Sequence, residues 1–274
     1  MIHHLNCASF HPPLVGSMVA HVLVVERPDG LLLVDTGFGT ADVAAPQRIG
    51  RAVRALMRPK MLPEETAIAQ LTALGYTADD VTDIVLTHLD VDHAGGVGDF
   101  PHARVHLDAA ELEAGRHPRG AEHGRYVREQ WAEADFVPHA APPAGGDAWF
   151  GFESVTEIGD GVLLVPLPGH SRGHSMVAVR DGDGWLAHAG DAYFHPGDLT
   201  SPPSAPRTVR VVQRLLAQDD AVRLANRDRL AELVAADHPD LRVFCAHDRA
   251  EFEAFGGPAG GGTGAGFPRS TGEI

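Results

Sequence analysis

Four side chains that can bind a metal ion stand within six positions of the stretch THLDVDHAGG, residues 87–96. They are His88, Asp90, Asp92 and His93, and the apolar segment 84–86 precedes them. Imidazole and carboxylate groups are common protein ligands of transition metals. If the chain stays extended, side chains 88, 90 and 92 leave one face while His93 turns to the other. This short segment therefore has the pattern needed to supply two neighbouring metal ions.

Three more candidate ligands stand just beyond apolar segments. His170 follows residues 162–167, Asp191 follows 185–189, and His247 follows 241–245. The end of a strand holds the backbone rigidly while the following loop leaves the side chain free to converge on a ligand. We therefore expect these three side chains to meet residues 88–93 at one edge of a sheet.

The elements that must position these residues follow from local patterns. Residues 22–25 and 31–34 are β-rich runs around the turn Arg-Pro-Asp-Gly, which predicts a hairpin. Further strands are predicted at 81–87, 104–107, 162–167, 176–180, 185–189 and 241–245, and helices at 48–58, 64–74, 108–134 and 208–236. The strand-rich halves before and after residue ~140 are expected to form the two sheets of one sandwich. Residues 256–274 are Gly-rich and are expected to form a mobile tail after a single domain of residues 1–255.

The charge, the apolar runs and the cysteine count of the chain exclude several classes of protein. The 274 residues are 44% hydrophobic and 22% charged, with a net charge of -15, which opposes binding to a phosphate backbone. No apolar run reaches the 18 residues that a membrane span requires, and the N-terminus lacks the pattern of a signal peptide. Cys7 and Cys245 are too few and too far apart for a disulfide framework. We expect a cytoplasmic protein with two free thiols and with neither nucleic acid nor membrane as partner.

The ordered candidate residues resemble the signature of the metallo-β-lactamase superfamily, HxHxDH followed downstream by a His, an Asp and a His. The matching positions are His88, Asp92, His93, His170, Asp191 and His247. The supporting segments Asp35-Thr36-Gly37 and Pro-Gly-His-Ser-x-Gly-His, which ends at His174, fit as well. This resemblance implies an α/β fold, the αββα sandwich, with two mixed β-sheets flanked by helices.

The resemblance also implies a dinuclear metal site. His88, Asp90 and His170 would hold one metal, Asp92, His93 and His247 the other, and Asp191 would bridge them. Two divalent ions can deprotonate a shared water near neutral pH, and the hydroxide would attack a carbonyl or phosphoryl centre. Asp35 is expected to hydrogen-bond the backbone near the site, because a buried carboxylate after a strand must find partners, and His174 is expected to support the site rather than bind metal.

One position departs from the family pattern. Asp90 stands where the usual signature has its second histidine, which gives HxDxDH. Zinc is the expected metal. A carboxylate makes the donor set harder and more anionic, however, which favours binding of Mn or Fe. Flavodiiron oxygen reductases, a branch of the same superfamily, are similar in carrying a carboxylate at this position.

The chain looks most like the quorum-quenching lactonase branch, which implies a hydrolase that opens a small-molecule lactone or cleaves a related ester. The expected catalytic residues are Asp92 and Asp191, at the metals, and Tyr193, because some lactonases carry a tyrosine in this region that hydrogen-bonds the substrate. Alternatives are a glyoxalase II-like thioester hydrolase and an iron-bearing redox enzyme of the same fold. Arg207, Arg210 and Arg214 recur at helical spacing, which favours a solvated helix face over a contact with an anionic substrate.

Overall fold

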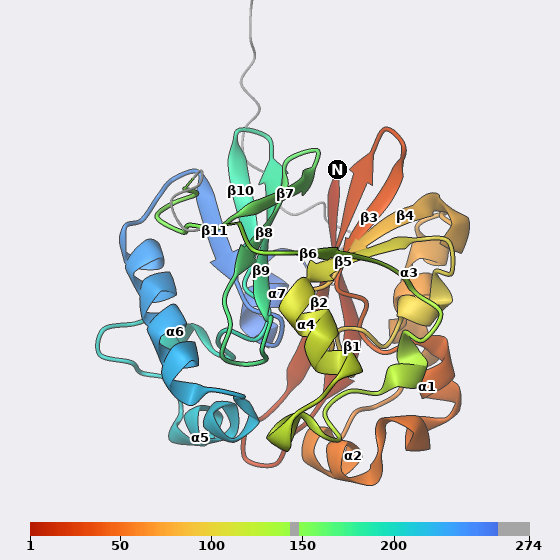
Figure 1. Cartoon of the computed structure of the whole chain (residues 1–274), viewed down its shortest axis with the longest axis horizontal. Coiled ribbons are helices and arrows are strands. Elements are labelled where there is room, and N and C mark those ends of the chain that lie inside the picture. Colours follow the sequence, from red (N-terminus) through yellow and green to blue (C-terminus); the bar gives the residue numbers. More distant parts are fainter. Residues whose placement is uncertain (143–147, 257–274) are drawn as a thin grey trace, which may run out of the picture.

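A computed structural model describes residues 1–142 and 148–256 and contains two β-sheets that face each other (Figure 1). The first sheet has six strands in the order in which they occur along the chain. They are β1 (Ile2–Phe10), β2 (Met18–Arg27), β3 (Gly30–Val34), β4 (Val81–Val85), β5 (Arg104–Asp108) and β6 (Asp135–His139). The first three pair antiparallel, and β3 to β6 pair parallel, so the sheet is mixed.

The second sheet has five strands in the order β11-β10-β9-β8-β7. They are β7 (Thr156–Gly159), β8 (Val162–Pro166), β9 (Ser175–Asp181), β10 (Gly184–His188) and β11 (Leu241–Phe244). Only β10 and β11 pair parallel. All strands of this sheet follow residue 140, which confirms the expected division of the chain into two sheets.

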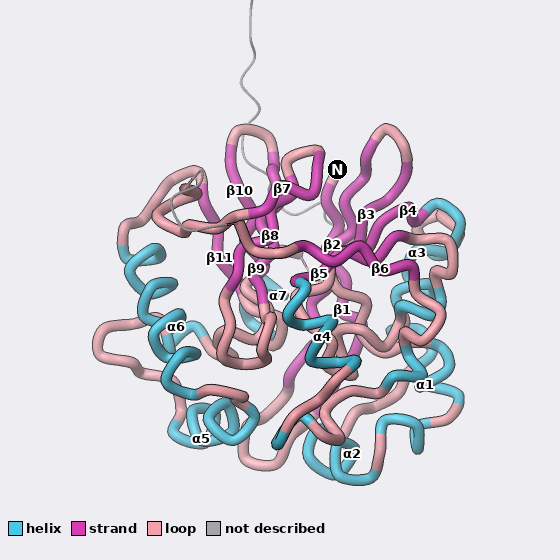
Figure 2. Tube along the Cα trace, in the orientation of Figure 1, coloured by secondary structure: helices cyan, strands magenta, loops and turns pink. Residues whose placement is uncertain are grey.

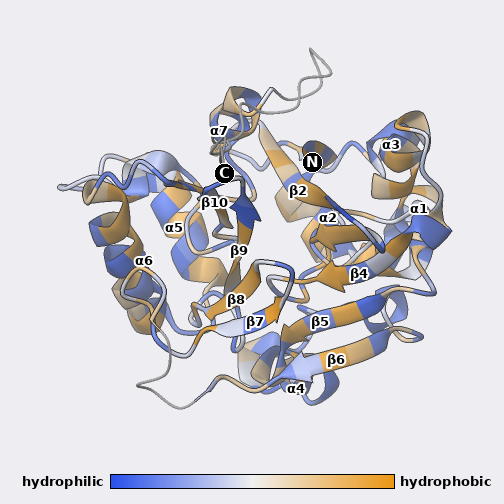
Figure 3. Ribbon diagram, turned by 90° about the horizontal axis from the view of Figure 1, so that it is seen from above, coloured by the Kyte–Doolittle hydropathy of each residue, from blue (hydrophilic) through white to orange (hydrophobic). Residues whose placement is uncertain are grey.

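Helices lie around the two sheets, some on their outer faces and others at the edge where the strands end. They are α1 (Thr40–Ala44), α2 (Arg51–Met57), α3 (Ala67–Ala73), α4 (Ala109–Arg116), α5 (Arg207–Leu216), α6 (Asp220–Ala235) and α7 (Arg249–Ala254). Figure 3 shows hydrophobic and hydrophilic residues together on α6, which is the pattern of a helix with one buried face. Within the described residues, no helix is long and apolar enough to span a membrane.

Successive side chains of a strand point to opposite faces of the sheet, and this divides the core into layers. In β3, Leu31 and Leu33 pack with α3, whereas Leu32 and Val34 pack between the two sheets. On the other side, Leu230 and Leu233 of α6 pack on the outer face of the second sheet. These layers confirm the sandwich of two mixed sheets flanked by helices, and they result from the two-residue period of side chains in a strand.

Strand direction brings the candidate ligands to one edge of the sandwich. The ends of β4, β8, β10 and β11 lead into the segments that carry residues 88–93, 170, 191 and 247. Backbone hydrogen bonds join these loops across the sheets: Ser175 donates to the carbonyl of Thr87, and Val19 donates to that of His247. Figure 2 shows loops and short helices gathered below the strands on this side.

The insertion between β5 and β6 differs from the expectation. The sequence predicts helix over 108–134, but α4 ends at Arg116, and only two short 3-10 turns follow, at 120–122 and 128–130. Pro118 disfavours helical backbone at the residue before it, and Gly120 and Gly124 adopt positive φ angles. The remaining residues form an irregular segment that lies against the metal-ligand loops. The predicted tail lies outside the described residues, apart from Gly256.

Candidate metal centre

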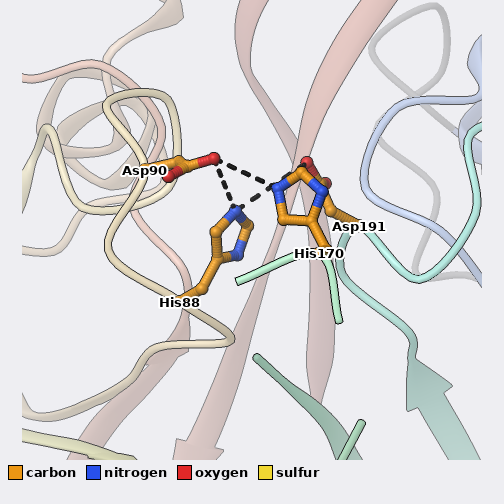
Figure 4. Close-up of side chains that lie close together, drawn as sticks. All are labelled: His88, Asp90, His170 and Asp191. Atoms are coloured by element: carbon orange, nitrogen blue, oxygen red, sulfur yellow. Dashed lines mark hydrogen bonds and ion pairs between the residues drawn. The ribbon is translucent and has the colours of Figure 1, made fainter. Parts of the chain in front are cut away.

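The first group of candidate ligands contains His88, Asp90, His170 and Asp191, whose ligand atoms all lie within 4.8 Å of one another. Figure 4 shows these four side chains pointing toward a common point. The Oδ2 atom of Asp90 lies 3.3 Å from Nε2 of His88 and 3.1 Å from Nε2 of His170. Three chain segments thus converge on one small volume.

The second group contains Asp92, His93 and His247, all buried. His93 Nε2 lies 3.4 Å from His247 Nε2, and His247 Nε2 lies 3.6 Å from Asp92 Oδ2. The structure therefore brings together all seven residues that the sequence predicts as metal ligands, and it divides them into two groups.

Asp191 lies between the two groups. Its Oδ1 atom is 2.9 Å from His247 Nε2 and 3.3 Å from His93 Nε2. Its Oδ2 atom is 3.2 Å from His170 Nε2 and 3.8 Å from His88 Nε2. One carboxylate oxygen faces each group, which is the geometry required of a bridging ligand.

In three of the histidines, the ring nitrogen that faces away from the centre contacts a protein oxygen. Nδ1 of His93 hydrogen-bonds Asp35, Nδ1 of His247 donates to the carbonyl of Val19, and Nδ1 of His88 lies 2.9 Å from Oγ1 of Thr87. Each of these three rings therefore turns Nε2 toward the centre. Such contacts fix the ring orientation and tautomer of metal-binding histidines.

Buried polar residues hold the loops themselves. Asp35 accepts hydrogen bonds from the backbone N–H and the hydroxyl of Thr87, which confirms its predicted role. Nε2 of His174 accepts a hydrogen bond from the backbone N–H of Asp191, so His174 is a supporting residue rather than a ligand. Glu111, which the sequence reasoning missed, binds the N–H groups of Leu89 and Gly173. It thereby ties the loop after β4 to the loop after β8.

Asp90 has an additional partner that the sequence reasoning also missed. Arg125 donates from Nε to Oδ1 of Asp90 at 2.5 Å and from Nη2 to Oδ2 at 2.7 Å. Its Nη1 atom donates to the backbone carbonyls of His170 and Leu216. No local pattern marks Arg125, because it lies in the irregular segment after α4.

The electrostatics of the site favour a cation. Burial raises the pKa of Asp92, as do the nearby carboxylates of Asp191 and Asp90, although His93 and His247 act in the opposite direction. Burial lowers the pKa of His93, but Asp191, Asp35 and Asp92 outweigh it and hold that pKa well above its ordinary value. Burial together with Arg125 lowers the pKa of His170 to about 4, which keeps this ring neutral and able to bind a metal.

Unpaired buried atoms test whether metal ions fit this site. His88 Nε2 and Asp191 Oδ1 are buried and, although they lie close to Asp90 and His247, neither forms a hydrogen bond of good geometry with a described residue. Orphaned polar atoms of this kind are costly unless an ion or a water binds them. Both atoms face the centre of the site, so the donor set fits a pair of divalent ions.

Comparisons with known proteins agree with this geometry. The family profile described as the metallo-beta-lactamase superfamily matches residues 16–247. The chain belongs to this superfamily.

Relatives within the superfamily include hydrolases and lactonases. A probable metallo-hydrolase of Mycobacterium tuberculosis is 44% identical over 251 residues, which cover 90% of this chain and 80% of the relative. An N-acyl homoserine lactonase of Bacillus cereus is 29% identical over 228 residues, which cover 82% and 79% of the two chains. The solved structure of a Bacillus thuringiensis lactonase variant with N-decanoyl-L-homoserine at its active site has a TM-score of 0.70 at 22% identity, covering 92% of this chain and 94% of that one. Membership of the superfamily supports a metal-dependent hydrolase that is related to the lactonases.

Tyr193 is not among the residues that surround the metal ligands. Its side chain is fully buried, and its hydroxyl donates to Glu251 at 3.0 Å. The next residue, Phe194, lines the cavity at the metal centre instead. The loop after Asp191 thus turns Tyr193 into the core, away from the cavity where its contact with substrate was expected. His195 caps the 3-10 turn 196–198 and does not line the cavity either.

A cavity of about 290 Å³ opens onto the metal centre. Asp90, Asp92, His170, Asp191 and His247 lie at its base. Its walls are mostly apolar and include Phe10, Met18, Val53, Met57, Phe194, Val212 and Leu216. An apolar cavity with convergent polar groups at one end is typical of a small-molecule site.

Proposed function

We propose that this protein is a dinuclear metal-dependent hydrolase that opens a lactone, or cleaves a related ester, whose acyl chain is apolar. The observation that carries the proposal is the position of the shared carboxylate Asp191. It faces both donor groups and also lines the apolar cavity. A substrate carbonyl at the base of the cavity would therefore meet the metal centre with its acyl chain against the apolar wall.

The donor set supports the metal-dependent part of the proposal. His88, Asp90 and His170 would hold one ion and Asp92, His93 and His247 the other, with Asp191 between them. When bound, two divalent ions would supply an activated water and a Lewis acid for the carbonyl oxygen. Each group supplies two imidazoles and one carboxylate besides Asp191, which suits zinc, and the carboxylate of Asp90 in place of the usual histidine makes Mn or Fe alternatives for the first.

The residues of this chain would bind and orient the substrate. Asp92 and Asp191 both line the cavity, so both carboxylates would lie beside the reacting ester group. The aromatic ring of Phe194 and the side chains of Val212 and Leu216 would exclude water from the acyl chain. Lactones carry one electrophilic carbonyl and one alkoxide leaving group, both of which suit a site with two cations.

The decisive experiment compares substrates on protein stripped with a chelator and reloaded with Zn, Mn or Fe. Acyl lactones are expected to be hydrolysed faster than thioesters and phosphodiesters of matched size. Each methylene that enters the cavity should raise kcat/KM about fourfold until the cavity is full, because its burial stabilises the complex by about 0.8 kcal/mol. Val212→Ser in the wall should weaken this dependence on chain length, whereas Val222→Ser on the outside of α6 should not. Preference for a thioester or a phosphodiester, or a rate independent of chain length, would reject the proposal.

A further inference from the structure

Three chain segments line the cavity away from the metal ligands, together with the segment 121–125. Pro12 belongs to the turn between β1 and β2, Leu56 to α2, and Leu215 to α5, and all three line the cavity. The turn is joined to α2, because the backbone N–H of His11 donates to the carbonyl of Met57. Figure 1 shows α2, this turn and α5 along the lower side of the molecule. We call residues 11–17, 46–62 and 200–218 the mouth segments.

The charge of the mouth segments is opposite to that of the whole chain. They contain no Asp or Glu, and their basic residues are Arg48, Arg51, Arg54, Arg58, Lys60, Arg207, Arg210 and Arg214. The whole chain has 37 acidic against 22 basic residues. The mouth segments thus carry eight basic and no acidic side chains, although Asp42 and Asp220 of neighbouring segments lie beside Arg48 and Arg214.

Most of these basic side chains are exposed and free to bind a partner. Arg48 pairs with Asp42, and Arg214 lies 3.8 Å from Asp220. In the part of the chain that the structure describes, no carboxylate forms an ion pair with Arg51, Arg54, Arg58, Lys60, Arg207 or Arg210. Unpaired arginines on a protein of net negative charge are not explained by intramolecular stabilisation.

Large apolar side chains project between the arginines. Leu14 is 85% exposed, Leu215 77%, Val211 55% and Leu56 42%. Each belongs to a mouth segment, and these four are half of the large hydrophobic residues that are exposed in the described part of the chain. Single exposed apolar residues are ordinary, but Leu56 and Leu215 line the cavity and Leu14 and Val211 belong to the same segments, and such a group marks an interaction surface.

We propose that the mouth segments dock the protein on an anionic lipid bilayer, with the opening of the cavity toward the membrane. Exposed apolar residues interspersed with Lys and Arg on short surface elements are the combination that binds the interface of a bilayer. The leucines would enter the boundary between headgroups and acyl chains, and the arginines would contact the lipid phosphates. The sequence predicts no membrane partner because it has no apolar run long enough to span a bilayer, but docking on the bilayer surface does not require such a run.

The net charge makes the proposal testable. A protein of charge -15 is repelled from an anionic membrane unless it presents one positive side, so attraction must depend on the mouth segments. Binding should therefore be orientation-specific, and it should weaken as added salt screens the arginines. The inference does not depend on the proposed reaction, because binding to vesicles is measured without turnover.

The experiment is flotation of the full-length protein with vesicles of phosphatidylcholine alone or with about a third phosphatidylglycerol. Wild type should float with the anionic vesicles and much less with the neutral ones. The pair Arg54→Gln and Arg210→Gln should weaken binding roughly 30-fold, from about fivefold for each charge near the surface. The control pair Arg104→Gln and Arg180→Gln removes the same charge from β5 and β9, where these side chains contact Asp83 and Trp185, and should leave binding unchanged.

The apolar contribution is tested separately. Leu14→Ser with Leu215→Ser should weaken binding even at high salt and should leave the folded protein intact, because both side chains are exposed. No binding to anionic vesicles at low salt would overturn the proposal, as would equal losses in the two arginine pairs. If wild type fails to float but is a dimer that the leucine substitutions make monomeric, a second copy of the chain covers this surface and the proposal is wrong.

Discussion

Arg125 holds the carboxylate of Asp90 with two parallel hydrogen bonds, Nε to Oδ1 at 2.5 Å and Nη2 to Oδ2 at 2.7 Å. This forked pair compensates the negative charge that Asp90 brings to a position where the superfamily usually has histidine. The site is thus less anionic than the sequence alone suggests. The same guanidinium binds the carbonyls of His170 and Leu216, so it joins two ligand loops to α5.

The substitution Asp90→His should destabilise the fold, because it leaves the guanidinium of Arg125 largely buried without an anion. Breaking one partner of such a pair costs about 3 kcal/mol. Asp90→His combined with Arg125→Gln should recover at least half of that loss, which denaturant unfolding of the metal-free proteins would measure. Asp90→His combined with Arg116→Gln is the control, since Arg116 contacts Phe136 rather than Asp90. Equal recovery in both double variants would mean that Arg125 and Asp90 are not coupled.

The metal preference of the double variant Asp90→His and Arg125→Gln should move toward Zn. The wild-type pair and its replacement are both neutral overall, so the two proteins differ in the type of donor and not in charge. Imidazole is a softer donor than carboxylate, and zinc prefers it. The test is the ratio of Zn to Mn activity after reloading the same apo-protein, together with the metal content. An unchanged ratio and unchanged content would show that Asp90 does not bind the metal.

Removal of the shared carboxylate should affect metal content and activity far more than folding. Wild type purified without chelators should carry close to two metal ions per chain, because seven donors exceed one tetrahedral site. Asp191→Ala should hold fewer ions and lose most turnover, while circular dichroism stays near that of wild type, since the sheets keep their apolar packing. Elemental analysis of the metal content and measurement of turnover together test whether Asp191 bridges the two ions. A variant with two ions and near-normal turnover would exclude Asp191 as the bridge.

The stability of the fold should depend on the ionisation of Glu251. Burial raises the pKa of this carboxyl from its ordinary 4.5 to about 7, although hydrogen bonds from Cys245 and Tyr193 act against the increase. Between these two pH values the folded protein retains a proton that the unfolded chain has released, so stability falls as pH rises through this window. Glu251→Gln, which mimics the protonated form, should therefore gain stability relative to wild type from pH 5 to 8.

Denaturant unfolding across that pH range measures the difference between the two proteins. Glu253→Gln, on the same helix with its side chain 62% exposed, is the matched control and should show no such trend. A constant difference between wild type and Glu251→Gln at all pH values would contradict the prediction.

Much of the fold and the seven candidate ligands could be predicted from the sequence, because local patterns encode them. Alternation marks strands such as β3, and each ligand stands directly after a strand, where direction and pairing leave little freedom. The two free cysteines are confirmed, since Cys7 and Cys245 are both buried and unpaired. These features depend on short stretches of chain that carry their own periodic signal.

Only the tertiary structure decided the remaining features. Arg125 reaches Asp90 across 35 positions from an irregular segment, and no periodicity predicts where such a segment packs. Adjacent residues of the loop after Asp191 point in different directions, with Tyr193 on Glu251 and Phe194 in the cavity, because packing rather than regular backbone sets each side chain. The basic segments 46–62 and 200–218 are far apart in sequence and meet at one opening only because the two sheets face each other. Long-range packing determines where these side chains and segments lie, whereas the local sequence determines their charge, polarity and ability to bind a ligand.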